Sequence, residues 1–569
     1  EDEDEDEDVG LSFTTRTLSE KLDSDISKAV RLEVALANFG SHWKGQITGG
    51  LGTTTGTQEY AEFADLLNDF LSHDWSASAK LKFVALCVEY NSLPAAIIAA
   101  VVSGIVGFLE IFMPGMRRMA GTGLVIAGDR LEVESAGYFG LMSGLLTFTF
   151  VFLFWQRIRK ALAQKSIFVF MDKLCIHQTD AELKTKGILG LAGFIKISDR
   201  LVILWSPRYF TRLWCIYEIA SWVKQRKPLR NIQILPLAEA AFVSSIFLAM
   251  CILCITLVWI ARLEAFMYMG TFAAVSLFTL GFPLHIIRRA VAELRIIDEQ
   301  LSTFEFAKAQ SFCCAVDHVL PGTDIRIPCD REIIQQKLDD WFATKEVSMR
   351  ASFSMMGNEV QTPVDRFNYY VQNNLTQQIL QRCGRGRVKY LTSLIACTPG
   401  WCYITDRLHM LWVIDGLAAI RLLCFYIAVT FGVFPACVRG TLFLAVQMDR
   451  CVGVRPNPVL DVAVTILGSV VIGCILLLFV GGLNFALMEE SSIYQIITLA
   501  ATGLATVLMY RHDLMAWYYD AKGMLTPEEQ KAKDEAKEVQ KARISMTAMK
   551  DAEAEAEADL EEKIEHIEV

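Results

Sequence analysis

Apolar runs of about twenty residues recur along this chain of 569 residues, and they constrain its fold more than any other feature. A helix needs about twenty mainly apolar residues to cross a bilayer. We therefore predict an α-helical transmembrane bundle of about seven spans, with six or eight as alternative counts. The runs are Leu93–Phe112, Gly137–Trp155, Ala240–Ala261, Ala265–Ile287, Leu411–Val438, Leu460–Gly482 and Ile493–Tyr510.

The composition supports a membrane protein and excludes other classes. Hydrophobic residues make up 53% of the chain, charged residues make up 21%, and the mean hydropathy is +0.34. Together with the long apolar runs, these values exclude a disordered chain and a purely soluble protein. The net charge is −10, and the acidic tails at 1–8 and 521–569 carry −14, so the rest of the chain is slightly basic. This charge argues against a nucleic-acid partner.

Basic residues predict which side of the membrane the intervening segments occupy. Clusters of Lys and Arg at 157–160, 224–230 and 288–289 flank the spans on one side. Because cytosolic loops are usually the basic ones, we expect these soluble segments on the cytosolic side, with the identity of the membrane left open. No secretory signal precedes the fifteen scattered cysteines, so we expect reduced thiols.

The segment between the second and third spans alternates strand and helix patterns. Short runs rich in β-branched and aromatic residues at 166–171, 200–205 and 230–235 predict buried strands. Helical patterns at 180–197 and 213–223 separate them. This alternation predicts a parallel sheet covered by helices.

This segment contains four motifs: Phe170 with Asp172, Lys186-Gly187-Ile188, Ser206-Pro207-Arg208-Tyr209 and Trp214-Cys215-Ile216-Tyr217-Glu218. Over about fifty residues, these motifs resemble those of Toll/interleukin receptor (TIR) domains. Such domains carry a strand ending at an acidic residue, a basic-Gly-Ile loop, a strand closed by Ser-x-x-Tyr, and a helix opening with Trp-Cys-x-x-Glu. The resemblance implies a TIR-like, flavodoxin-like α/β fold.

The resemblance also implies a first strand, a fifth strand and a final helix outside this segment. Phe70–Ser72 matches the first strand, and Ala79–Tyr90 the helix after it. Ser311–Val316 and the helical pattern at 330–342 could supply the last strand and helix.

We therefore expect one TIR-like domain with two membrane hairpins inserted in it, and a partial domain with unrelated flanks is the alternative. The combined length of the pieces suits a single domain. The expected order is an acidic, flexible segment (1–59), the first part of the domain (60–92), a membrane hairpin (93–156), the central part (157–239), a second hairpin (240–287), the last part (288–345), a cytosolic linker with a helix (346–410), the C-terminal membrane region (411–512) and a charged helical or disordered tail (513–569).

Three functions are compatible with this architecture. The first is signalling or scaffolding through association of the TIR-like domain, including self-association. The second is cleavage of NAD, for which the resemblance makes Glu218 the candidate catalytic residue. In that case the resemblance places the NAD cleft at His73, Asp74, Trp75, Lys186, Gly187 and Trp214. A Glu in the first turn of a helix is also favoured by the helix dipole without any catalytic role.

The third function is a channel or transporter with a regulatory TIR-like domain. Asp415 and Arg421 lie in or near a predicted span, where ionisable residues are costly and often functional. Their spacing of six does not place them on one helix face. Basic residues at 382–389 precede the next span and could bind anionic headgroups of membrane lipid, although a plain positive flank is the preferred interpretation.

Two further patterns carry weaker signals. Cys175 with His177, and the set Cys313, Cys314, His318 and Cys329, offer zinc-ligand chemistry, but no usual pair of Cys-x-x-Cys motifs is present. We therefore interpret these as isolated thiols and surface histidines and expect no metal. The Gly-rich stretch 49–56 lacks the lysine of a phosphate-binding loop and is interpreted as a linker.

Overall fold

The architecture was established from a computed structural model of the chain. The structure describes residues 18, 22–44, 61–113, 124–126, 129–131, 138–260, 265–319, 322, 324, 326–343, 362–376, 389–406, 417–451, 457–488, 497 and 500–511. Asp415, the Gly-rich stretch 49–56 and both acidic tails lie outside these residues.

A mixed sheet of six strands forms the centre of the soluble part. Its strand order is β2-β1-β6-β3-β7-β8, in which the last four strands are parallel and β1 is antiparallel to both its neighbours. The strands are β1 (Lys28–Arg31), β2 (Ala61–Phe63), β3 (Leu67–His73), β6 (Phe168–Phe170), β7 (Ser198–Trp205) and β8 (Ile232–Pro236).

Of the parallel strands, β6, β7 and β8 were predicted from apolar runs, and β3 was implied by the resemblance at Phe70–Ser72. Residues 201–205 of β7 are all buried, because helices cover both faces of a parallel sheet. Phe70 of β3 stacks on Phe170 of β6, with ring centroids 4.5 Å apart. β1 and β2 were not predicted. Residues 28–31 fall in the N-terminal segment that was expected to be flexible, and instead they pair with β6.

Two expectations about the elements around the sheet need correction. Residues 311–316 do not form a fifth strand. Phe312–Ala315 form the short helix α10, capped by the Ser311 hydroxyl, which accepts a hydrogen bond from the Cys314 N–H. The single helix expected at 180–197 is divided at Gly190 into α5 (Ala181–Leu189) and α6 (Leu191–Ile197). The predicted last helix is present as α11 (Asp330–Ala343).

Five helices in the described part of the chain are long and apolar enough to cross a membrane. They belong to α2 (Ala79–Phe112), α3 (Phe139–Ala161), α8 (Leu237–Ile260), α9 (Ala265–Ser302) and α19 (Phe434–Cys451). The fifth candidate span begins before α19, at Leu423, and ends with it. α20 (Pro458–Met488) covers the sixth expected span, and the seventh is described only in part. The prediction of seven spans therefore exceeds the five candidate spans found in the described residues.

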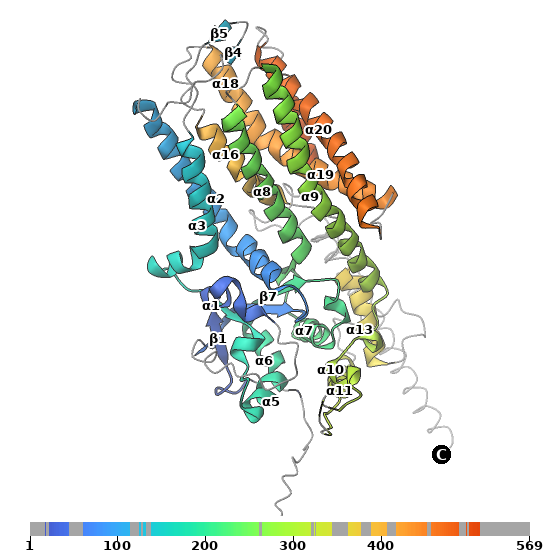
Figure 1. Cartoon of the computed structure of the whole chain (residues 1–569). Coiled ribbons are helices and arrows are strands. Elements are labelled where there is room, and N and C mark those ends of the chain that lie inside the picture. Colours follow the sequence, from blue (N-terminus) through green and yellow to red (C-terminus); the bar gives the residue numbers. More distant parts are fainter. Residues whose placement is uncertain are drawn as a thin grey trace, which may run out of the picture.

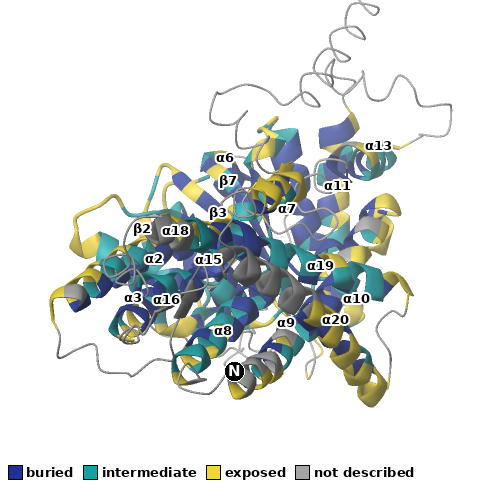
Figure 2. Cartoon of the chain, turned by 90° about the horizontal axis from the view of Figure 1, so that it is seen from above, coloured by how far each residue is buried: buried dark blue, intermediate teal, exposed yellow. Residues whose placement is uncertain are grey.

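The long helices lie side by side as a bundle, and the sheet lies at one end of it (Figure 1). α2 packs along α3, and α8 packs along α9. On α2, Ala96 and Ala99 face the bundle, whereas Ile97, Val101 and Ile105 point outward and are each 55% exposed. The view from above shows exposed positions along the outer helices (Figure 2). Exposed apolar side chains on the outside of a bundle suit contact with lipid.

A buried ion pair joins two helices of this bundle. The Arg288 guanidinium on α9 lies 2.9 Å from the Asp461 carboxylate on α20 and donates to the Thr465 hydroxyl at 2.7 Å. Both charged side chains are almost fully buried. Such pairs satisfy one another's charge in an apolar environment.

One hydrophobic core in the soluble part includes residues from segments that the membrane helices separate. It contains Leu67, Phe170, Leu301 and Trp341. It also contains Phe367 of α13 (Pro363–Tyr370), a helix in the region expected to be a linker. In the same region, α15 (Tyr390–Ala396) and α16 (Thr398–Thr405) pack against helices of the bundle.

Candidate functional site

Polar side chains gather where the parallel strands end at their carboxyl edge. β3 is the first of the four parallel strands in the chain, and it lies between the second, β6, and the third, β7. In open α/β sheets, ligands bind at the carboxyl edge where the chain reverses its direction of strand addition. Here that point lies between β3 and β7. The polar residues at this edge are Ser72, His73, Asp74, Asp172, Ser206 and Glu218.

Glu218 projects from α7 (Leu213–Lys224) onto the end of β3. The Ser72 hydroxyl donates a hydrogen bond to its carboxyl group, and Ser72 Oγ also lies 2.5 Å from the Tyr209 hydroxyl. Burial raises the pKa of Glu218 to about 8, the nearby charge of Asp172 adds to this, and the Ser72 hydrogen bond opposes it. Glu218 is therefore largely protonated at neutral pH. Such a perturbed carboxyl at a ligand-binding edge is a functional-site signal.

The buried side chain of His73 is held neutral at the same edge. Its ring packs against the Trp43 indole with centroids 4.9 Å apart, and its Nε2 lies 3.9 Å from Asp172 Oδ1. Burial lowers the pKa of His73 to about 4, and the Asp172 charge offsets this only in part. A neutral imidazole can accept or donate one hydrogen bond at each ring nitrogen.

Asp74 stays ionised although it is buried. Burial opposes ionisation, but hydrogen bonds from Ser76 and the charges of Arg212 and Arg208 outweigh it and hold the pKa of Asp74 below its usual range. The Ser76 N–H and hydroxyl lie 3.1 and 2.6 Å from the carboxylate, and the Arg212 Nε lies 3.8 Å from it. Asp74 therefore acts as a fixed negative charge that organises the loop after β3.

Trp75 lies at the solvent-exposed surface of this edge of the sheet. Its side chain is 52% exposed, its indole N–H donates to Asp172 Oδ2 at 2.5 Å, and the Lys173 ammonium lies 5.7 Å from its ring. An indole held in this way presents a face on which a flat aromatic ligand could stack.

Lys82, which was not predicted, adds a buried cation. It lies in the first turns of α2, which directly follows the loop after β3, and its side chain is fully buried. Within the described part of the chain its ammonium has no hydrogen-bond partner, and it lies 5.9 Å from the Trp43 ring centroid. The nearby acidic groups are Asp74 and Asp172. The sequence signal that could have identified Lys82 is a lysine inside an apolar stretch of predicted helix.

The other predicted cleft residues make their contacts elsewhere. Lys186 on α5 forms an exposed ion pair with Glu182 at 2.6 Å. Gly187 lies against Ile176. The Trp214 indole N–H donates to Asp330 at 3.2 Å, on the side of α7 that faces α11. The structure thus brings together Glu218, His73, Asp74 and Trp75, but it provides no contact between these and the remaining three residues.

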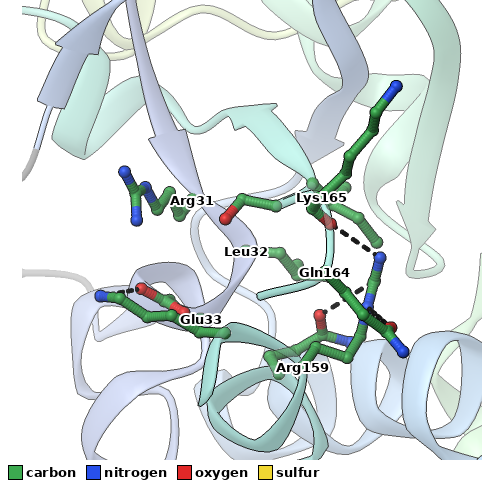
Figure 3. A pocket seen from close by; sticks show the side chains of 10 residues that line it. Arg31, Leu32, Glu33, Arg159, Gln164 and Lys165 are labelled. Carbon is green, nitrogen blue, oxygen red and sulfur yellow. Dashed lines mark hydrogen bonds and ion pairs between the residues drawn. The ribbon is translucent and has the colours of Figure 1, made fainter. Parts of the chain in front are cut away.

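A small pocket lies apart from this edge, between β1 and the end of α3 (Figure 3). Arg159 in its wall donates to the Lys165 carbonyl at 2.8 Å, and Lys160 pairs with Glu33 at 2.8 Å. Its space suits about one water molecule. Polar side chains from the sheet and from the end of α3 line this pocket, and it is too small for a nucleotide.

The two sets of candidate zinc ligands have different surroundings. Cys175 is buried with its thiol beside the Met171 N–H, and His177 accepts a hydrogen bond from the Asp180 N–H. The ligand atoms of Cys313, Cys314, His318 and Cys329, in contrast, all lie within 4.8 Å of one another.

Comparisons with known proteins identify no relative. No protein-family model, no curated protein and no solved structure matches the chain.

Proposed function

We propose that this chain is an integral membrane signalling protein whose soluble α/β domain resembles TIR domains and acts by associating with other copies of itself. The observation that carries the proposal is the continuity of α2. This single helix begins beside the carboxyl edge of the sheet, buries Lys82 there, and runs on as one of the apolar bundle helices. A rigid element shared by both parts can couple a change in one to the other.

The shared hydrophobic core supports a TIR-like domain built across two membrane hairpins. Core residues come from before the first hairpin, from between the hairpins and from after the second. α8 likewise starts directly where β8 ends, so a second helix leaves the sheet for the bundle. The domain therefore cannot shift freely against the membrane helices. We place it on the cytosolic side because its flanks are basic.

The surface we propose for association is the β2 edge of the sheet. β2 is the terminal strand of the sheet among the described residues. Phe63, the last residue of β2, is 70% exposed, and Leu66, just after the strand, is 72% exposed. Exposed apolar side chains on an open sheet edge favour pairing with another chain.

Cross-linking tests this surface. We expect the full-length protein in lipid nanodiscs of two-chain capacity to form cross-linked dimers, and Phe63→Glu with Leu66→Glu to reduce their yield at least about tenfold. Leu162→Glu, a control at a position 62% exposed beyond the end of α3, should leave the yield unchanged. Absence of dimers from the well-folded parent would contradict association.

Cleavage of NAD at Glu218 is the second candidate, and the buried cation Lys82 favours it. The Lys82 ammonium has no hydrogen-bond partner among the described residues, and its place near the start of α2 suits a phosphate group, because the helix terminus also favours anions. The exposed face of Trp75 suits an aromatic base. The positive nicotinamide ring of bound NAD would lower the pKa of Glu218 and return it to the anion.

In that reaction the bond between the nicotinamide nitrogen and the ribose carbon breaks. Nicotinamide leaves with the bonding electron pair, and positive charge builds on the ribose, where the Glu218 carboxylate stabilises it. A water oxygen then bonds to the ribose carbon and loses a proton. Ser72 would position the carboxyl group through its hydrogen bond.

The test is release of nicotinamide by the full-length protein in micelles. Glu218→Gln should reduce the rate by about 10²-fold or more, because it removes the anion while keeping the shape of the side chain. Glu182→Gln, at an exposed glutamate of α5, should leave it unchanged. No release by folded, concentrated parent protein would exclude this candidate and leave association standing.

A further inference from the structure

Four potential metal ligands meet beside α11, although their sequence spacing follows no common motif. Cys314 Sγ lies 3.9 Å from Cys313 Sγ, 3.8 Å from Cys329 Sγ and 3.7 Å from His318 Nε2. Cys313 is buried and the other three are partly buried.

These separations match the edges of a zinc tetrahedron. With Zn–S bonds of about 2.3 Å and Zn–N bonds of about 2.0–2.1 Å, ligand atoms lie about 3.6–3.8 Å apart. They are too long for a disulfide, in which the sulfur atoms lie about 2.05 Å apart. Three thiols and one imidazole are also a ligand set that structural zinc sites use.

The backbone conformation around the cluster positions these four side chains. Asp317 and His318 both adopt left-handed conformations, with φ of 51° and 60°, which non-glycine residues rarely hold unless their surroundings compensate. The Ile327 N–H donates to the His318 carbonyl at 2.9 Å, which closes the turn. The Asp330 N–H donates to Cys313 Sγ at 3.2 Å, as an outer-shell donor to a metal-bound thiolate would.

We propose that Cys313, Cys314, His318 and Cys329 bind one Zn²⁺ as a structural site. The four protein ligands complete the tetrahedron, so no open position remains for a substrate. The ion would tie the α10 turn to the start of α11.

The location of the cluster explains what the ion would stabilise. Asp330, next to Cys329, accepts a hydrogen bond from the Trp214 indole of α7 at 3.2 Å. Gln310, just before α10, accepts one from the Leu213 N–H at 3.0 Å. Further along α11, Trp341 stacks on Tyr217 of α7 with ring centroids 5.5 Å apart. Zinc would therefore hold α11 against the helix that carries Glu218.

Metal analysis of the full-length protein in micelles tests the proposal. We expect about one zinc ion per chain by inductively coupled plasma mass spectrometry, and a loss of at least about tenfold in Cys314→Ser and Cys329→Ser. Cys451→Ser, at an exposed cysteine ending α19, is the matched control and should keep the full zinc content.

Two measurements separate loss of metal from loss of folding. His318→Cys supplies a fourth thiolate and should retain zinc, whereas His318→Ala should lose it. Co²⁺ exchanged into the parent protein should give the visible d–d and thiolate charge-transfer bands of a tetrahedral site, and added Zn²⁺ should abolish them.

Several results would overturn the proposal. These are a parent protein free of zinc that gives no tetrahedral Co²⁺ spectrum, a disulfide within the cluster found by mass spectrometry, or stoichiometric iron in place of zinc. Zinc retained at full content by both cysteine variants would also overturn it.

Discussion

At the scale of single residues, the chemistry of this site depends on the surroundings of each group more than on its residue type. Glu218 and Asp74 carry the same carboxyl group, yet burial raises the pKa of the first, while the hydrogen bonds and arginine charges around the second lower its pKa. Two carboxyls with opposite shifts at one edge can play different roles, one as a proton carrier and one as a fixed charge.

The raised pKa of Glu218 predicts a loss of stability as the pH rises from about 4.5 to about 8. The folded protein keeps the proton up to about pH 8, whereas the unfolded chain releases it near 4.5. The unfolded state therefore binds fewer protons between these values, and stability falls as the pH rises through this window, by a few kcal/mol at most. Glu218→Gln should melt like the parent at pH 5 and at a higher temperature than the parent at pH 8.

Melting curves in micelles between pH 5 and 8 measure this effect. Glu182→Gln is the control, because its side chain is exposed on α5. If the parent and Glu218→Gln lose stability in parallel over this range, Glu218 does not carry the buried proton.

At the scale of elements, close helix contacts depend on glycines that leave no room for a side chain. Gly144 of α3 faces Cys402 of α16, and an added Cβ would overlap the Cys402 sulfur. Gly104 of α2 has no neighbour within 4 Å of an added Cβ. Small residues at such contacts let membrane helices approach closely.

Gly144→Ala should therefore destabilise the bundle, and Gly104→Ala should not. We expect a loss of about 1–3 kcal/mol at position 144, because α3 and α16 must move apart. At position 104 we expect no loss or a small gain, because alanine favours a helix. Thermal unfolding in the same detergent measures both. Equal melting temperatures for the two variants would contradict the packing described here.

At the scale of the whole molecule, long helices that span a membrane, as we propose, would carry the chain across it in alternate directions. α2 has 34 residues, long enough for a span and for the turns that precede it at the sheet. α3 returns the chain to the sheet, where β6 begins soon after its end. The first hairpin thus has its open end at the soluble domain and its connection at the far side.

This topology predicts opposite accessibility for two exposed positions. Met113, just after α2, and Gln164, in the loop after α3, should be labelled from opposite sides of a sealed membrane when each is changed to cysteine. A membrane-impermeant maleimide, compared with the unmodified chain as background, measures this. Labelling of both positions from the same side would contradict the crossing of α2 and α3.

The sequence by itself determined features that depend on neighbouring residues. Apolar runs predicted the long helices, and β-branched runs predicted β6, β7 and β8, because hydrophobic periodicity is local. β3 was implied only by the resemblance at Phe70–Ser72. The sequence did not predict β1 and β2, whose pairing depends on partners far along the chain. At 311–316 it predicted a strand, whereas capping by Ser311 favours a helical turn there.

Only the tertiary structure decided which chemical groups meet. Glu218 was predicted from a motif, but its protonation depends on its burial, which the hydrogen bond from Ser72, 146 residues away, opposes. Lys82 gained its significance from its complete burial, which its place in an apolar stretch of helix does not by itself specify. Cys329 follows Cys314 by fifteen residues, yet their sulfur atoms lie 3.8 Å apart, next to the left-handed residues 317 and 318. Distances between remote side chains arise from packing, and spacing along the chain does not specify them.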